Sequence, residues 1–359
     1  MIYYLSHFST IFSGFNIFRY ITFRAFSGFL LGFILSIIIM PKFIKYIKSK
    51  QFVQTIREDG PKTHLSKQNT PTMGGVVILI SLLISILLTA RLNRFVIWSI
   101  LSILYLGILG FIDDYLKIIK KHPHGVSAKS KLLFQTIFAL ILCIYLYIYP
   151  PNYHYSSHLH IPYLKQTFIN LGIFYFLIIT LTFVGASNGI NLTDGLDGLA
   201  IGNIIFVSIT YSILCYIAGN YKLASYLKLV YVAGSGELTI VLSCLAGAGL
   251  GFLWYNSYPA SIFMGDTGSL FLGGLIGTIA IFIKQELLLI IAGGVFVAEA
   301  LSVILQVAYY KKTKKRIFLM APLHHHYELK GYHEAKITIR FWIISILLSI
   351  IALSSLKIR

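Results

Sequence analysis

Five acidic residues stand out because each lies where a long apolar run meets a more polar segment. The chain has 359 residues with 12 Asp and Glu, and these five are Asp113, Asp114, Asp194, Asp197 and Asp266. Carboxylates at the edge of an apolar region are costly to desolvate and usually functional. They can bind a divalent cation or transfer a proton. If the apolar runs pack side by side, the five carboxylates would meet in one cleft.

Asp113 and Asp114 form the first candidate site, with Lys117 four residues after Asp113. On a continuing helix Asp113 and Lys117 would be neighbours. Two adjacent carboxylates beside a lysine suit metal binding or proton transfer. The structural alternative is the boundary of an apolar span with a local ion pair, and the three residues alone leave both interpretations open.

The second candidate site consists of four polar residues at intervals of three: Asn188, Asn191, Asp194 and Asp197. A helical turn would place them on one side. The alternative is that Asn191, Thr193 or Asp194 caps the following apolar span, near 200–217, with the neighbouring glycines supplying the turn. Capping explains one such residue well and four poorly.

Asp266, in the segment Gly265–Ser269, is the third candidate, although a residue of this type at the start of an apolar run is often only a helix N-cap. The fourth is the run His324, His325 and His326 within Ala321–Glu328. Adjacent imidazoles point in different directions and no cysteine lies nearby, which argues against zinc. We expect these histidines to donate hydrogen bonds to a phosphate or diphosphate.

The loop before the second apolar run contains Lys67 and Thr72, between prolines and glycines that fix its course. Both side chains can donate to phosphate oxygens. The alternative for the lysine is the general excess of basic residues in cytoplasmic loops.

These segments must be positioned by membrane-spanning helices. The composition is 57% hydrophobic and 12% charged, with a mean hydropathy of +0.79, which places the chain in a bilayer. A span needs roughly 20 apolar residues. The sequence predicts an all-α integral membrane protein, a single polytopic domain over residues 1–359, with ten spans. They lie near 23–41, 73–90, 95–112, 132–150, 170–187, 200–217, 237–255, 263–283, 287–308 and 338–356.

Basic residues dominate the charge: 30 Lys and Arg give a net charge of +18. They lie in short loops between apolar runs, which argues against nucleic acid as a partner. They concentrate in the loops after spans one, three and nine, so these loops are predicted to be cytoplasmic, with both termini outside. All five acidic residues would then face a cytoplasmic cleft. Cys143, Cys215 and Cys244 lie in apolar runs and are expected to be inert.

Together the motifs resemble the polyprenyl-phosphate N-acetylhexosamine-1-phosphate transferases. They cover nearly the whole chain: 70–75, 113–114, 191–198, 265–269 and 321–328. Asn69 replaces an expected glycine, but Asn tolerates the left-handed backbone better than most residues. The resemblance implies ten spans in the bacterial inner membrane, a cleft on the cytoplasmic face, a homodimer and Mg²⁺ as cofactor.

The resemblance also implies residue roles. Asp266 would bind magnesium, Asp113 and Asp114 would handle the carrier phosphate, and His324 would take part in catalysis. Asn188, Asn191, Asp194 and Asp197 would form the polar wall of the site. The residues implied to line the nucleotide and sugar-phosphate region are Lys67, Thr72, Lys117, Lys131, Phe263, Gln306, His325 and His326.

The implied reaction transfers phospho-N-acetylmuramoyl-pentapeptide from UDP-MurNAc-pentapeptide to undecaprenyl phosphate, giving lipid I and UMP for peptidoglycan synthesis. Direct attack by the carrier phosphate is favoured over a covalent aspartyl intermediate, because it needs one displacement and the phosphate is already anionic. A relative that uses UDP-N-acetylglucosamine is the close alternative, and the segment Ala321–Glu328 argues against it. A secondary transporter would carry its acidic residues nearer the bilayer midplane.

Overall fold

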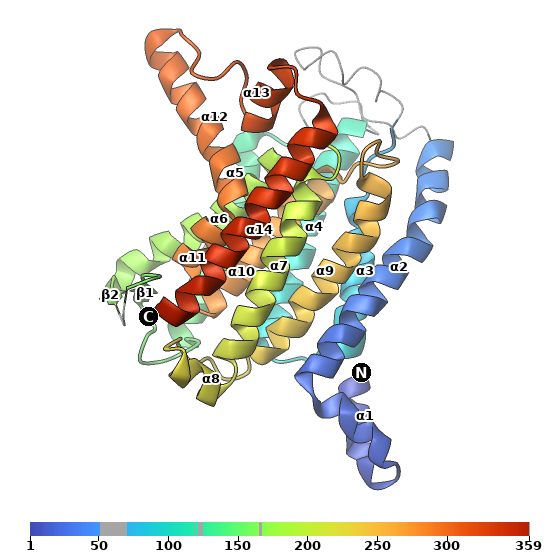
Figure 1. Ribbon diagram of the computed structural model, residues 1–359, viewed down its shortest axis with the longest axis vertical. Coiled ribbons are helices and arrows are strands. Elements are labelled where there is room, and N and C mark those ends of the chain that lie inside the picture. Colours follow the sequence, from blue (N-terminus) through green and yellow to red (C-terminus); the bar gives the residue numbers. More distant parts are fainter. Residues whose placement is uncertain (51–69, 119, 121–124, 165–166, 359) are drawn as a thin grey trace.

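The protein is a bundle of long helices, described here from a computed structural model (Figure 1). The structure describes every residue except 51–69, 119, 121–124, 165–166 and 359. The long helices are α2 (Ile21–Ser49), α3 (Gly75–Thr89), α4 (Arg94–Ile118), α5 (Ala128–Ile148), α6 (Tyr175–Thr193), α7 (Leu199–Ala218), α9 (Gly236–Asn256), α10 (Gly265–Phe282), α12 (Gly294–Thr313) and α14 (Glu334–Ile358).

Shorter elements connect or extend these helices. They are α1 (Ile2–Leu5), η1 (Ser6–Thr10), η2 (Ser13–Arg19), β1 (His158–His160), β2 (Phe168–Asn170), η4 (Gly172–Phe174), α8 (Tyr221–Tyr226), α11 (Glu286–Ala292) and α13 (Leu323–Leu329). The strands β1 and β2 pair antiparallel in a small hairpin. The prediction of an all-α chain therefore misses one short sheet between α5 and α6.

Within the described residues, nine helices are long and apolar enough to cross a membrane, and α3 is a shorter apolar helix. The protein is therefore a multi-pass membrane protein, and all ten predicted spans correspond to helices. The prediction of the ninth span was wrong in one respect. A continuous span was expected at 287–308, but it is divided at Gly293 into α11 and α12. Figure 1 shows α12 leaning away from the bundle, and it places both chain ends toward the end opposite α13.

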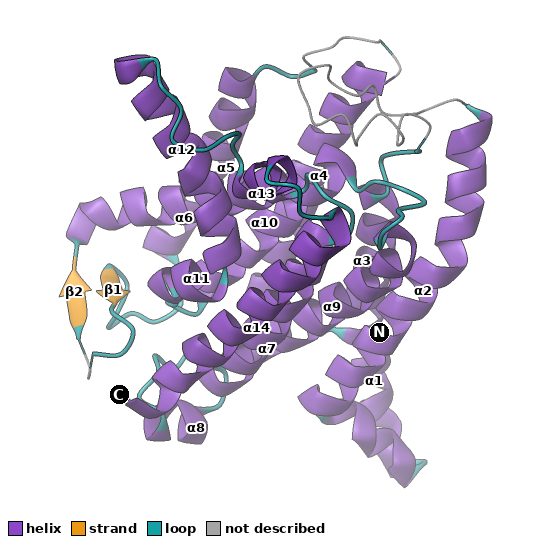
Figure 2. Ribbon diagram, turned by 45° about the horizontal axis from the view of Figure 1, so that its top comes forward, coloured by secondary structure: helices purple, strands orange, loops and turns teal. Residues whose placement is uncertain are grey.

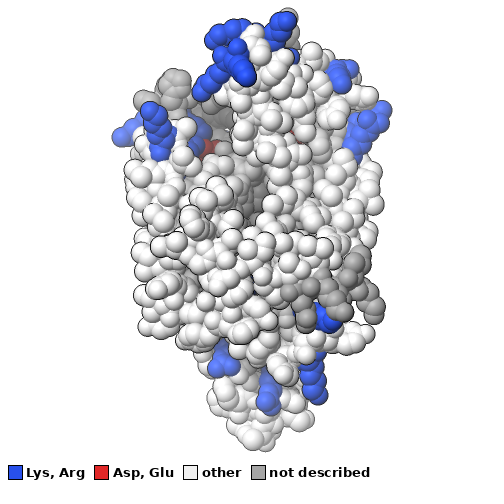
Figure 3. Space-filling model, turned by 90° about the vertical axis from the view of Figure 1, so that its left-hand side faces the viewer, with Lys and Arg blue, Asp and Glu red and all other residues white. Residues whose placement is uncertain are grey.

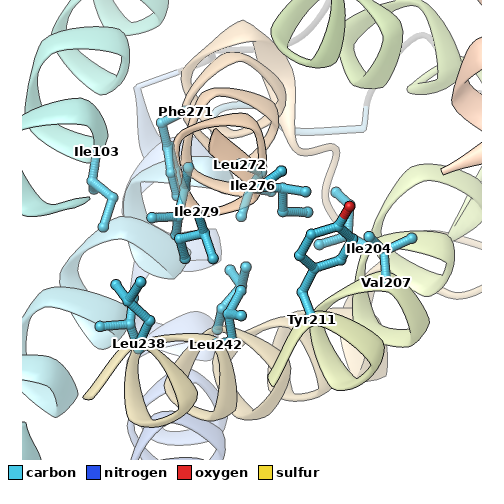
Figure 4. Packing of buried hydrophobic residues seen from close by; sticks show 14 of the residues in the cluster. Ile103, Ile204, Val207, Tyr211, Leu238, Leu242, Phe271, Leu272, Ile276 and Ile279 are labelled. Carbon is cyan, nitrogen blue, oxygen red and sulfur yellow. The ribbon is translucent and has the colours of Figure 1, made fainter. Parts of the chain in front are cut away.

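The core forms around α9 and α10, which pack against α2, α4, α6 and α7. In Figure 4, Leu272, Ile276 and Ile279 of α10 point toward Tyr211 of α7 and Leu242 of α9. Of the most apolar 18-residue stretch of α10, 89% is buried inside the protein, against 33% for the corresponding stretch of α2. Lipid therefore contacts the outer helices, whereas α10 is enclosed by protein.

Small residues allow the helices to approach closely, as is common where lipid supplies no hydrophobic drive between helices. A Cβ atom added at Gly247 of α9 would lie 2.0 Å from the carbonyl oxygen of Phe29 on α2. Added at Gly273 of α10, it would lie 2.4 Å from the carbonyl oxygen of Ala186 on α6. These contacts fix the helix pairs that carry the candidate site.

Candidate active site

Three segments distant in sequence meet at the beginning of α10. A Cβ atom added at Gly110 of α4 would lie 2.2 Å from the carbonyl oxygen of Asp266, and one at Gly75 of α3 would lie 2.2 Å from the backbone nitrogen of Gly268. The segment before α3 adds backbone hydrogen bonds, from the Phe263 nitrogen to the Pro71 oxygen at 2.8 Å and from the Gly74 nitrogen to the Phe263 oxygen at 2.8 Å. The ends of α3, α4 and α10 are thereby locked together.

This packing brings the predicted carboxylates into one cluster. Ligand atoms of Asp113, Asp114 and Asp266 all lie within 4.8 Å of one another. Among the described residues, this is the one group of three or more metal-ligating side chains. α4 continues to Ile118 and Asp113 is fully buried, so a simple span boundary does not describe this site. Asp266 is also not an N-cap, because α10 begins at Gly265 and no side chain caps it from Met264.

Two lysines neutralise part of this negative charge. Lys117 Nζ lies 2.5 Å from Asp113 Oδ2 and 3.1 Å from Asp266 Oδ2. Lys131 Nζ lies 2.9 Å from Asp113 Oδ2 and also forms an ion pair with Asp266. With all three carboxylates ionised, the two ammonium groups would leave a formal charge of −1. Such a cluster can accept a divalent cation, and its lysines can pair with phosphate oxygens.

The two neighbouring aspartates of α4 have different partners. Asp113 Oδ1 accepts a hydrogen bond from the Val126 nitrogen at 2.7 Å, while its Oδ2 faces the lysines. Asp114 instead accepts from the backbone nitrogens of Asp266 at 3.0 Å and Thr267 at 2.8 Å, and from the Thr267 hydroxyl at 2.6 Å. Asp114 therefore caps the N-terminus of α10 from a different helix.

The polar wall predicted on α6 divides into two parts. Asn191 Nδ2 donates to Asp266 Oδ1 at 3.0 Å and to the Ser269 hydroxyl at 2.8 Å. Asn188 Nδ2 donates to Gln135 Oε1 at 2.8 Å, so Asn188 joins the wall through α5. Gln135 and Ser269 were not among the predicted site residues, and their only signal in the sequence was a polar side chain inside an apolar span.

Asp194 and Asp197 lie in the turn between α6 and α7. α7 begins at Leu199, and its N-cap residue is Gly198, with no side-chain cap hydrogen bond. Capping of α7 therefore does not explain these acids. Shielding from water raises the pKa of the Asp194 carboxyl above its ordinary value, and the carboxylates of Asp266 and Asp114 add to the effect. Asp197 Oδ2 accepts from the Ala260 nitrogen at 2.9 Å, which ties the turn to the segment before α10.

The three histidines have separate partners. A Cβ atom added at Gly195 would lie 2.2 Å from His324 Nε2, so this imidazole lies directly against the turn after α6. His325 Nδ1 lies 2.7 Å from Glu328 Oε2. His326 Nδ1 accepts from the Leu319 nitrogen at 3.1 Å.

Of the remaining predicted residues, Gln306, Thr72 and Phe263 lie outside the carboxylate cluster. Gln306 Oε1 accepts from the backbone nitrogens of Ile317 and Phe318 at 3.0 Å each, and so shapes the loop after α12. Thr72 is buried within the segment that contacts Phe263. Lys67 lies outside the described residues.

An apolar cavity of about 300 Å³ lies between α6, α10, α11 and α12. Along α6 it is lined from Ile178 to Ile190, and Ile190 directly precedes Asn191 of the polar wall. The cavity therefore runs from the level of the carboxylates along the membrane-embedded part of the bundle. Figure 3 shows a hollow beneath the basic residues at one end, with acidic atoms visible in it.

Comparison with known proteins identifies the family of the chain. Residues 96–284 match glycosyl transferase family 4, and residues 67–79 match the phospho-N-acetylmuramoyl-pentapeptide-transferase signature 1. Phospho-N-acetylmuramoyl-pentapeptide-transferases are similar over nearly the whole chain. That of Desulfotalea psychrophila is 52% identical over 98% of this chain and 97% of its own length. That of Endomicrobium trichonymphae is 51% identical over 98% of each chain. That of Desulforapulum autotrophicum is also 51% identical, over 100% of each chain. The chain therefore belongs to glycosyl transferase family 4 and, within it, to the phospho-N-acetylmuramoyl-pentapeptide-transferases.

Proposed function

We infer that the protein transfers phospho-N-acetylmuramoyl-pentapeptide from UDP-MurNAc-pentapeptide to undecaprenyl phosphate, releasing UMP and forming lipid I. The observation that carries this inference is the cluster of Asp113, Asp266, Lys117 and Lys131 at the ends of α4, α5 and α10. Two phosphate-bearing substrates must approach each other there, so a mixed cluster of carboxylates and ammonium groups is needed. The membrane location suits an acceptor whose polyprenyl tail stays in lipid.

We propose Mg²⁺ as the cofactor, with Asp266 as its principal ligand and Asp113 beside it. The donor set fits, because magnesium in such sites is bound by one or two carboxylates together with substrate phosphate oxygens. When bound, the ion would offset repulsion between the two substrates and charge on the transferred phosphoryl group. Asn191 would hold the Asp266 carboxylate in place through its hydrogen bond of 3.0 Å.

In this proposal the chain's own residues orient both phosphates. Lys117 and Lys131 would bind the donor diphosphate, and Asp113 would face the carrier phosphate. A carrier oxygen attacks the phosphorus next to the sugar, a new phosphorus–oxygen bond forms, and the bond to UMP breaks. Thr72, Phe263, Gln306, His325 and His326, and Lys67 outside the described residues, remain predicted to line the nucleotide and sugar region, with His324 donating to a substrate phosphate.

The apolar cavity along α6 supports a lipid acceptor. Its lining on α6 reaches Ile190, the residue before Asn191, and the cavity as a whole is lined mainly by Ile, Leu, Val and Phe side chains. A polyprenyl chain could lie in it while its phosphate reaches Asp113. A homodimer, a bacterial inner-membrane location and a cleft facing the cytoplasm remain predictions for the whole protein.

The test is release of UMP by the purified protein. We expect release with UDP-MurNAc-pentapeptide and undecaprenyl phosphate together, none when either is omitted, and none without Mg²⁺. UDP-N-acetylglucosamine should be turned over far more slowly, and a preference for it would contradict the proposed donor.

Asp266→Asn tests the metal assignment. The substitution keeps the size of the side chain but removes its charge, so the folded variant should lose at least about 100-fold in kcat, which corresponds to roughly 3 kcal/mol. Near wild-type turnover with unchanged Mg²⁺ dependence in a folded Asp266→Asn protein would overturn the assignment.

A further inference from the structure

Glu299 is a buried carboxylate that no motif in the sequence singled out. It lies on α12 with no solvent exposure, and its Oε2 has no hydrogen-bond partner among the described residues. Its nearest ionisable neighbour is His324 of α13: Glu299 Oε1 lies 3.3 Å from His324 Nδ1. A carboxylate buried in this way is costly unless it is paired. Within the described part of the chain, His324 is the group that can pair with it.

His324 is held between two segments. Its ring, 1% exposed, has Glu299 on the Nδ1 side and Gly195 on the Nε2 side. Gly195 directly follows Asp194, in the turn that joins α6 to α7. Asn191, near the end of α6, contacts Asp266. Figure 2 shows α13 at one end of the bundle, where it contacts α12 and α14. Glu299 therefore faces the nitrogen on the side away from the turn. Nε2, which has no hydrogen-bond partner among the described residues, faces the turn.

We propose that Glu299 is a positioning residue, which holds the His324 imidazole so that its Nε2–H donates to a phosphate oxygen of the substrate. When the ring carries a proton on each nitrogen, Nδ1–H faces Glu299 and Nε2–H is free to donate to the phosphate oxygen. The Glu299 carboxylate also fixes the orientation of the ring, as second-layer carboxylates do for other functional histidines. This inference rests on the proposed function, since it requires an anionic substrate at the turn after α6.

A purely structural role for Glu299 makes a different prediction. Its Oε1 also accepts from the backbone nitrogen of His324 at 3.2 Å, which could simply anchor the start of α13. That backbone nitrogen persists when the His324 side chain is replaced, whereas the imidazole contact does not. A double-mutant cycle therefore separates the two roles.

The cycle compares Glu299→Gln, His324→Asn and the double variant in the full-length protein. We expect Glu299→Gln to lower kcat by roughly 10- to 100-fold, the range for carboxylates that orient a functional histidine. In the His324→Asn background the same change should cost less than about 2-fold. Equal losses in both backgrounds would show that Glu299 acts on the backbone and would overturn the proposal.

A second readout covers variants with too little turnover. Titration calorimetry with UDP-MurNAc-pentapeptide should show weaker donor binding for Glu299→Gln, and no further weakening when it is added to His324→Asn. If Glu299→Gln does not fold, Glu299→Asp, which keeps the charge, takes its place in the kinetic cycle and in the binding cycle. Losses in donor affinity that are equal in the two backgrounds would again overturn the proposal.

Ser302→Ala is the matched control, since Ser302 is buried on the same helix and its hydroxyl donates to the Glu299 carbonyl oxygen at 2.7 Å. It should keep wild-type kinetics. If it lost activity as Glu299→Gln does, disturbance of α12 rather than the imidazole contact would explain the effect. A wild-type protein that releases no UMP would contradict the proposed function itself, whereas an active wild type with additive losses contradicts the Glu299 assignment alone.

Discussion

At the scale of single residues, Asp113 and Asp114 show that neighbours in sequence can have separate tasks. Asp113 faces two lysines, whereas both oxygens of Asp114 are bound to the first turn of α10. The sequence predicted one functional pair, because adjacent carboxylates look alike until their partners are known. We now expect Asp113 to act on the carrier phosphate and Asp114 to act through the position of Asp266.

Asp114→Ala should therefore lower the free energy of unfolding by about 2–3 kcal/mol, because it leaves two buried N–H groups and the Thr267 hydroxyl without their charged acceptor. Asp113→Ala should cost less stability than Asp114→Ala, because Asp113 accepts one backbone N–H bond, from Val126, and its lysine partners are partly exposed and can turn toward water. Thermal unfolding in detergent, with UMP release measured in parallel, checks both. Both variants should lose activity. Equal losses of stability in the two variants would contradict the separate roles proposed for Asp113 and Asp114.

At the scale of helices, the site depends on how closely α4 approaches α10. Gly110→Ala should separate the two helices, because its Cβ atom would lie 2.2 Å from the backbone oxygen of Asp266. We expect an activity loss of at least about 10-fold, since a displacement near 1 Å at a reacting centre has large effects, together with a lower melting temperature.

Gly107→Ala, three residues earlier on α4, is the control for this experiment. Its Cβ atom would meet the end of the flexible Leu79 side chain, which can move aside. Replacing a helical glycine by alanine otherwise gains up to about 1 kcal/mol, so Gly107→Ala should be neutral or stabilising and active. Similar kinetics for the two variants would argue against a special role for the α4–α10 contact.

The length and apolar composition of the runs were sufficient to predict all ten apolar helices, but not where the helices break or how they cross. The division at Gly293 was missed because Gly293 and Gly294 lie within an unbroken apolar run, and glycine is common in spanning helices. The β1–β2 hairpin was missed because its strands have three residues each. The convergence of the aspartates was predicted from their positions at span ends, whereas Glu299 was missed because its partner lies in another element.

At the scale of the whole molecule, charge is distributed by depth. Figure 3 shows a broad belt without charged residues between basic residues at the two ends, with the hollow and its acidic atoms near one end. The loop after α12 and the β1–β2 region lie toward opposite ends of the bundle (Figure 1). The excess of basic residues in the loop after α12 favours a cytoplasmic location for that end.

Cysteine labelling checks this orientation. Lys315→Cys should react with an impermeant thiol reagent only after the membrane is opened, whereas Tyr153→Cys should react in cells with a permeable outer membrane and an intact inner one. Both positions are exposed. The native Cys143, Cys215 and Cys244 are all buried and serve as an unreactive background. The opposite labelling pattern would reverse the orientation and place the carboxylate cluster on the wrong side for a cytosolic nucleotide.

The enclosure of α10 also bears on how the protein is made. Because the ribosome delivers the chain from its N-terminus, α4 and α6 are already synthesised when α10 emerges, and they carry Asp114 and Asn191. The backbone amide groups at the start of α10, which have no partner within that helix, therefore find an acceptor in a helix that is synthesised earlier. These amides need not face lipid without an acceptor at any stage of insertion. The order of the helices along the chain thus matches the order in which the end of the bundle that carries the proposed site can be assembled.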